Sequence, residues 1–214
     1  MTLLSSTIDC IVFDLGRVLI DLDFELAFEY WATASGQELT EIRSRFALDD
    51  AYCAQERGEI EASDYFSHLR KTLGLDLSDE EFLFGWNSIF LEPVSGIEPL
   101  LNELKPLKPL HVFSNTNAAH QEFWSQRYAD LLAPFQQIVC SHELGARKPG
   151  VEAFLQLAGQ LSSSPGRMLF FDDLPENVDG ARSAGLQAHC VRSAGEIRRI
   201  LAADYLLPID GLNP

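Results

Sequence analysis

The chain has 214 residues, 46% of them hydrophobic and 22% charged, a composition typical of one globular core that can carry a small inserted module. Its formal net charge of −16 at pH 7 argues against nucleic acid and anionic membrane surfaces as partners, because both recruit Lys and Arg. No apolar run reaches the roughly 20 residues of a membrane span and residues 1–6 lack a secretory signal, so we expect a cytoplasmic monomer or homodimer that acts on a small molecule.

The first predicted element is a buried strand over residues 9–13. Its apolar run, Ile11–Phe13, stops abruptly at Asp14, as parallel strands of α/β proteins often do. A turn at Gly16 follows, and then a second apolar stretch over residues 18–20.

Beyond this stretch the pattern changes to apolar residues three and four positions apart, which is typical of amphipathic helices. The predicted helices cover residues 25–34, 40–46, 62–73 and 79–90. Thr40 and Ser78 are candidate N-caps, Glu81 would complete a capping box with Ser78, and Gly74 would close the third helix. We therefore expect an all-helical cap domain over residues 23–92, inserted after the first strand.

After the cap, segments typical of helices and strands alternate to the end of the chain. The predicted helices cover residues 97–104, 118–128, 151–161, 176–184 and 194–203, and the strands cover 111–113, 137–140, 167–171 and 187–191. Such alternation indicates right-handed βαβ crossovers. The predicted fold class is α/β: a doubly wound, Rossmann-like parallel sheet in a core domain of residues 1–22 and 93–214, with the cap inserted. Three cysteines in strand-like runs are expected as buried free thiols, at positions 10, 140 and 190.

Polar clusters follow three of these strands where each strand ends. Asp14 follows the first strand, Ser114-Asn115 the second, and Asp172-Asp173 the strand over residues 167–171. Ligands of open α/β sheets bind beyond the carboxyl ends of the strands, so these side chains should meet, with Lys148 in a nearby loop. Together they suit a divalent cation and a phosphoryl group. Turns, helix caps and a surface lysine explain each of them singly but not as a set.

The segments that carry these residues resemble the four motifs of the haloacid dehalogenase superfamily. They are FDLGRVL, FSNTN, RKP and FDD followed by Asn177, at residues 13–19, 113–117, 147–149 and 171–173. A helical insert stands where the type-one (C1) cap of subfamily IA belongs, and the chain is most similar to the branch typified by alpha-D-glucose-1-phosphate phosphatase. The resemblance implies a Mg²⁺-dependent phosphatase of small phosphorylated metabolites, above all sugar phosphates such as glucose 1-phosphate.

On this interpretation, Asp14 attacks phosphorus and forms a covalent aspartyl-phosphate, which splits hydrolysis into two displacements. Asp173, and second to it Asp172, would hold Mg²⁺ together with Asp14 and the backbone carbonyl of Gly16. Asn177, one helical turn later, would anchor the loop or reach a metal-bound water.

Lys148 would supply positive charge to the phosphoryl oxygens and restrain the nucleophile. Ser114 and Asn115 would donate hydrogen bonds to the same oxygens. Arg17 would contact the substrate or the cap, or else form a salt bridge to Asp21 or Asp23.

One position departs from the superfamily pattern. Most of its phosphatases carry a second Asp two residues after the nucleophile as general acid and base, and this chain has Gly16 there. General acid–base assistance is typically worth about 10²–10⁴ in rate, so we expect an unusually good leaving group, such as the anomeric oxygen of a sugar 1-phosphate. Alternatively, Asp21 or a substrate hydroxyl takes over the missing role.

Two other functions stay open. A 2-haloacid dehalogenase would use the same nucleophile without a metal, although the Asp172-Asp173 pair counts against it. A poorly active phosphate-binding or scaffold protein would also be compatible with the missing acid, although the retention of the other site residues counts against that as well.

Overall fold

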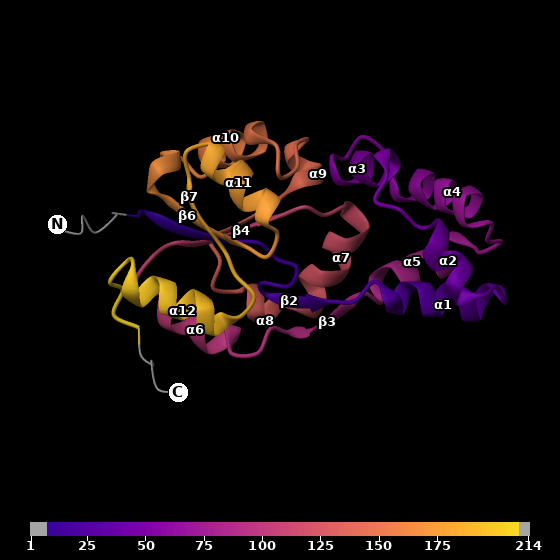
Figure 1. Ribbon diagram of the computed structural model, residues 1–214, viewed down its shortest axis with the longest axis horizontal. Coiled ribbons are helices and arrows are strands. Elements are labelled where there is room, and N and C mark those ends of the chain that lie inside the picture. The colour runs from indigo at the N-terminus through magenta and orange to yellow at the C-terminus, as the bar shows by residue number, and fades with distance from the viewer. Residues whose placement is uncertain (1–7, 210–214) are drawn as a thin grey trace.

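The computed structural model describes residues 8–209, in which helices cover both faces of a parallel sheet (Figure 1). Within these residues, five strands pair in parallel in the order β5–β4–β1–β6–β7. Their bounds are Gln137–Cys140, Leu110–Ser114, Cys10–Phe13, Met168–Asp172 and Gln187–Cys190. The chain winds outward from β1 in both directions, which confirms the doubly wound α/β fold.

Both faces of this sheet are buried, and successive side chains of β1 point into two different clusters. Ile11 and Phe13 pack in the cluster that includes residues of α6 (Ile97–Leu104) and α12 (Ala194–Ala203). Val12 packs on the opposite face with residues of α10 (Val151–Gln160) and α11 (Pro175–Ser183). This packing explains why the core strands are almost continuously apolar, and Figure 1 shows the two helical layers on either side.

The segment between β2 (Ile20–Leu22) and β3 (Phe90–Pro93) forms a helical lobe beside the sheet (Figure 1). Its helices are α1 (Glu25–Ser35), α2 (Leu39–Arg45), α3 (Asp50–Glu56), α4 (Ala62–Leu73) and α5 (Asp79–Asn87). Buried aromatic side chains hold the lobe together: Trp31 and Trp86 stack with ring centroids 6.1 Å apart. The predicted capping box at Ser78 and the left-handed cap at Gly74 are confirmed.

A two-stranded antiparallel sheet joins this lobe to the core. It pairs β2 (Ile20–Leu22) with β3 (Phe90–Pro93), so the chain enters and leaves the lobe at neighbouring points. The helix predicted to reach residue 90 ends at Asn87 instead, because the carbonyl of Ile89 accepts a hydrogen bond from the Asp23 N–H in this junction.

Other predictions of local structure were wrong. Helix α2 starts at Leu39 after Glu38, so Thr40 lies inside the helix and does not cap it. Cys10 and Cys140 are buried as expected, but Cys190 is exposed, because it ends β7 at the edge of the sheet. Several short elements were not predicted, among them β2, α3, β3, α8 (Ala129–Leu132) and α9 (Ser141–Leu144). No helix within residues 8–209 is both long and apolar enough to span a bilayer.

Candidate active site

The carboxyl ends of β1, β4 and β6 bring the predicted polar residues to one edge of the sheet. Phe13 lies opposite Phe171 in the paired strands, so the residues that follow them, Asp14 and Asp172, are neighbours. Carboxylate oxygens of Asp14, Asp172 and Asp173 all lie within 4.8 Å of one another, and no other acidic, His or Cys cluster of this kind occurs within residues 8–209. The group has the oxygen ligands that a hard divalent cation prefers.

Lys148 is buried between two of these carboxylates and is only 1% exposed. Its Nζ lies 2.5 Å from Oδ1 of Asp14 and 2.8 Å from Oδ2 of Asp172. The rings of Phe113 and Phe170 pack around the ammonium, with centroids 5.4 and 5.3 Å from Nζ. Burial alone lowers the pKa of Lys148, but the two carboxylates outweigh it and raise the pKa, so the lysine stays charged.

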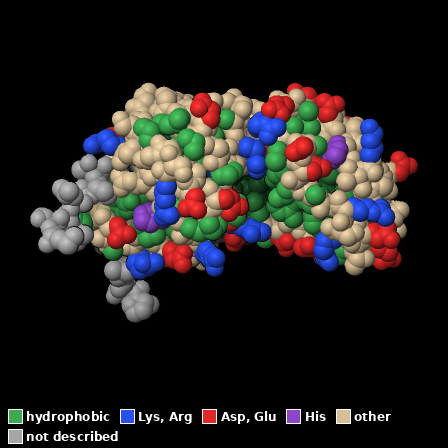
Figure 2. All heavy atoms as spheres, turned by 45° about the horizontal axis from the view of Figure 1, so that its top comes forward, with side chains coloured by type: hydrophobic (Ala, Val, Ile, Leu, Met, Phe, Trp, Pro, Cys, Tyr) green, Lys and Arg blue, Asp and Glu red, His purple; other side chains and the backbone are tan. Residues whose placement is uncertain are grey.

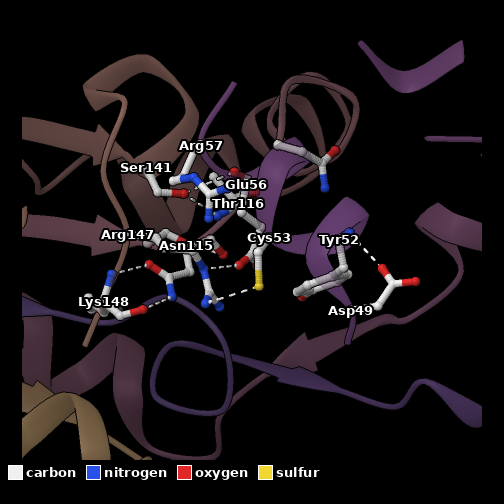
Figure 3. Close-up of polar contacts among 12 residues, drawn as sticks. Asp49, Tyr52, Cys53, Glu56, Arg57, Asn115, Thr116, Ser141, Arg147 and Lys148 are labelled. Carbon is white, nitrogen blue, oxygen red and sulfur yellow. Dashed lines mark hydrogen bonds and ion pairs between the residues drawn. The ribbon is translucent and has the colours of Figure 1, made fainter. Parts of the chain in front are cut away.

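The backbone around Lys148 is fixed by the side chain of Asn115, as Figure 3 shows. Oδ1 of Asn115 accepts a hydrogen bond from the Lys148 N–H at 2.9 Å, and Nδ2 donates to the Lys148 carbonyl at 3.0 Å. On the other side, Gly180 of α11 lets the helix approach the loop, since a Cβ there would stand 2.1 Å from the carbonyl oxygen of Pro149. Asn115, predicted to bind phosphate, borders the cavity, and its side-chain amide also positions the lysine loop.

The two adjacent aspartates have different partners. Asp172 accepts hydrogen bonds from the Leu174 N–H at 2.9 Å and from Nδ2 of Asn177 at 3.0 and 3.1 Å, in addition to its ion pair with Lys148. Within residues 8–209, the Asp173 carboxylate forms no ion pair and no hydrogen bond with another side chain, and it borders the cavity. Asp173 and Asp14 therefore fit a metal ion, whereas Asp172 holds the lysine and Asn177 anchors Asp172.

The site is crowded with negative charge. Burial raises the pKa of Asp14 to about 7, and the nearby charges of Asp172 and Asp173 add to the increase while Lys148 opposes it. Burial also raises the pKa of Asp173, with a further increase from Asp172. One lysine does not balance three carboxylates, so a divalent cation beside Asp14 and Asp173 would favour their ionised forms.

A cavity of about 340 Å³ opens above these residues, between the sheet edge and the helical lobe. Ser114 and Arg17, predicted to bind the substrate, and Gly16, predicted to offer its carbonyl to the metal, all border it. Arg17 is exposed and forms no salt bridge with any residue of the described part of the chain, so its predicted pairing with Asp21 or Asp23 is not formed.

Asp21, predicted as a substitute acid, does not border the cavity. Successive side chains of a strand point to opposite sides, and on β2 it is Leu22 that faces the cavity while Asp21 is exposed. Leu22 also fills the space beside Gly16: a Cβ on Gly16 would stand 2.6 Å from the Leu22 Cδ1. An apolar side chain thus lies where a side chain at position 16 would project.

An ion pair that the sequence did not reveal joins the helical lobe to the lysine loop. Nε of Arg147 donates to Oε2 of Glu56 at 2.7 Å, and Nη1 lies 3.5 Å from Sγ of Cys53 (Figure 3). Glu56 is 4% exposed; burial raises its pKa, while Arg147 and the Tyr52 hydroxyl lower it. The partners are 91 residues apart, and no pattern in the sequence links them.

His120 is a second residue of the cavity wall that the sequence did not single out as part of the site. Its Nε2 lies 3.0 Å from the carbonyl oxygen of Trp86 and its Nδ1 3.2 Å from Nδ2 of Asn117. Complete burial lowers its pKa to about 3, although the Trp86 carbonyl acts in the opposite direction. His120 is thus neutral, and because both of its ring nitrogens are hydrogen-bonded within the protein, its role is structural.

Comparisons with known proteins agree with this geometry. The family model described as haloacid dehalogenase-like hydrolase matches residues 8–185. A phosphatase from Mycobacterium tuberculosis is 28% identical over 97% of this chain and 100% of its own length, and a sesquiterpene phosphatase from Aspergillus oryzae is 29% identical over 85% and 88%. Among solved structures, an enzyme of the family from Bacteroides thetaiotaomicron, in complex with magnesium and inorganic phosphate, superposes with a TM-score of 0.75 at 25% identity, covering 87% of this chain and 96% of that one.

Proposed function

The chain belongs to the haloacid dehalogenase-like hydrolase family, and from that premise we propose that it is a Mg²⁺-dependent phosphatase of small phosphorylated metabolites. The observation that carries the proposal is the arrangement around Asp14. One of its oxygens is held 2.5 Å from the Lys148 ammonium, and the carboxylate of Asp173 stands beside it at the cavity floor. A fixed carboxylate, a fixed ammonium and an uncommitted acid are what phosphoryl transfer through an aspartyl enzyme requires.

In the first step, an oxygen of Asp14 attacks phosphorus, and the bond between phosphorus and the alcohol oxygen breaks. The alcohol oxygen leaves with the electron pair and takes a proton from water. Lys148 and the Ser114 hydroxyl donate hydrogen bonds to the phosphoryl oxygens as charge builds on them. In the second step, water attacks phosphorus, the bond to Asp14 breaks, and phosphate leaves with the water oxygen, so the carboxylate is regenerated.

Magnesium would be held by Asp14, Asp173 and the backbone carbonyl of Gly16, and would supply positive charge to the phosphoryl oxygens. Asp172 is assigned a positioning role instead, because its oxygens already bind Lys148, Asn177 and a backbone N–H. We also propose that residues 23–92 act as a C1-type cap over this site.

The missing acid at Gly16 restricts the substrate. The described residues place no acidic side chain at the cavity beyond Asp14, Asp173 and the ion-paired Glu56. The leaving alcohol must therefore depart with little protonation by the protein. Sugar 1-phosphates such as glucose 1-phosphate meet this condition, as in the branch that the sequence resembles, and aryl phosphates meet it as well.

The test is phosphate release from p-nitrophenyl phosphate, with Mg²⁺ and with a chelator. We expect metal-dependent turnover that is lost in Asp14→Asn and retained in Asp21→Asn, the matched control outside the cavity. Halide release from 2-chloropropionate without a metal would support the dehalogenase alternative instead. Failure of both reactions, with phosphate still bound, would support the scaffold alternative.

A further inference from the structure

We propose that the upper part of the cavity is an apolar subsite, and that the preferred substrates are phosphate monoesters whose alcohol is both apolar and a good leaving group, such as phenols, rather than polyhydroxylated sugars. This inference rests on the proposed phosphatase function and narrows its substrate class. It depends on which side chains line the cavity away from the phosphate end, and on how many of the polar ones are still available to a ligand.

Apolar side chains make most of the wall above the phosphate end. Leu22 comes from β2, Phe90 comes from β3, and Ile89 directly precedes β3. Phe24 and Leu48 come from the helical lobe. Leu48 is 62% exposed although it is a large apolar side chain. Figure 2 shows green hydrophobic side chains lining the dark hollow between the two halves of the molecule. A bound apolar group would cover this surface.

Several polar side chains that line the cavity already have partners. Both ring nitrogens of His120 have partners, and Glu56 is ion-paired with Arg147. Oγ1 of Thr116 accepts a hydrogen bond from Trp124 at 3.3 Å. A sugar would bury several hydroxyl groups here without matching partners, and each unpaired buried hydroxyl is costly.

Two polar side chains that the ion pair of Glu56 and the hydrogen bonds of His120 do not involve lie at the other end. Arg17 lies close enough to Asp173 to lower the pKa of that carboxyl, and Ser114 follows β4 at the sheet edge. Both belong with the phosphate and the metal. Leu22 of the apolar wall occupies the space beside Gly16, so the wall begins next to this polar end of the cavity.

The test measures inhibition constants of competitors against hydrolysis of p-nitrophenyl phosphate, so it does not depend on turnover of the competitor. The competitors are ethyl, butyl and hexyl phosphate, with glucose 1-phosphate and glucose 6-phosphate as polar counterparts. We expect the inhibition constant to fall about fourfold per methylene, which is the ~0.8 kcal/mol of one buried CH₂ converted at ~1.4 kcal/mol per tenfold. A flat alkyl series, or tighter binding of either glucose phosphate than of hexyl phosphate, would overturn the proposal.

A matched pair of variants locates the effect. Leu48→Ser should lower the ratio of ethyl to hexyl inhibition constants by about threefold or more, because it removes apolar surface from the wall. Leu155→Ser, at an exposed leucine of α10 outside the cavity, should leave that ratio unchanged. Equal ratios in Leu48→Ser and the unmodified protein would contradict the assignment of the wall.

Failure of this inference differs from failure of the proposed function. If p-nitrophenyl phosphate is hydrolysed with Mg²⁺ and the alkyl series is flat, only the apolar subsite is refuted. If no condition releases phosphate, the phosphatase proposal itself fails, and calorimetric titration of the same alkyl phosphates still measures the subsite.

Discussion

Installing an acid at position 16 tests how this site manages without one. Gly16 is not among the glycines with positive φ, so its backbone accepts a side chain. Space is the obstacle, because a Cβ would meet Cδ1 of Leu22 at 2.6 Å and Cγ at 3.6 Å. The double variant Gly16→Asp/Leu22→Ala provides both the carboxyl group and the room for it. Its carboxyl would project into the cavity on the side of Asp14, since the added Cβ is 4.0 Å from Oδ2 of that residue.

General acid assistance is worth about 10²–10⁴ in rate, or about 3–5 kcal/mol of barrier, and most for leaving groups of high pKa. We expect the double variant to gain about 10²-fold in kcat/KM on alkyl phosphates and little on p-nitrophenyl phosphate. The assay measures kcat/KM for aryl and alkyl phosphates of increasing leaving-group pKa. The plot of log kcat/KM against leaving-group pKa should have a shallower slope for the double variant than for the unmodified protein.

Two controls separate protonation from space. Leu22→Ala alone creates the same room without an acid, and Gly16→Asn/Leu22→Ala supplies the same shape without a transferable proton. Both should keep the steep dependence of the unmodified protein. If the aspartate variant is folded and shows the same slope as the asparagine variant, the missing acid does not limit this enzyme and the reasoning is refuted.

Three further predictions concern charge and stability. Lys148→Met leaves two buried carboxylates without their cation, so it should lower the free energy of unfolding by about 3–5 kcal/mol. Mg²⁺ should restore part of this loss, and urea unfolding with and without the metal measures both effects. A double-mutant cycle of Glu56→Gln and Arg147→Met should give a coupling energy of about 1–3 kcal/mol, and a value near zero would mean that the ion pair does not hold the lobe to the core. His120 has a folded pKa of about 3 against an ordinary 6.5, so unfolding takes up a proton below pH 6.5 and stability falls. Between pH 7.5 and 5 the unmodified protein should lose about 2 kcal/mol more than His120→Gln, and parallel stability curves would exclude this cause.

The strands that carry the site could be predicted because apolar runs stop at polar residues. Phe13 and Phe171 are each followed by an aspartate, and the parallel order of the sheet then places the two acids together. Adjacent acids cannot be assigned separate roles from sequence alone. Only the coordinates show that Asp172 binds the lysine and an amide while Asp173 faces the cavity.

Other features depend on pairings between distant segments. Glu56 and Arg147 meet because the helical lobe folds back over the sheet edge. Neither their residue types nor their spacing in the sequence predicts this contact. The position of Asp21 outside the cavity could not be predicted for a more local reason. Recognition of β2 as a strand would have put Asp21 and Leu22 on opposite sides, but three residues are too few for alternation to be visible.

Because β2 pairs with β3, the helical lobe is inserted into the core at a single place. Leu22 lies opposite Phe90 in that small sheet, so the segment between them begins and ends at one place, and a tight turn of about two residues is enough to join such strands. Asp14, Lys148 and Asp173 all lie on the core side of this small sheet, while Leu48 and Glu56 belong to the helical lobe. Evolution can therefore exchange the helical lobe, and with it the surface that contacts the alcohol part of the substrate, without changing the core residues proposed to act on the phosphate.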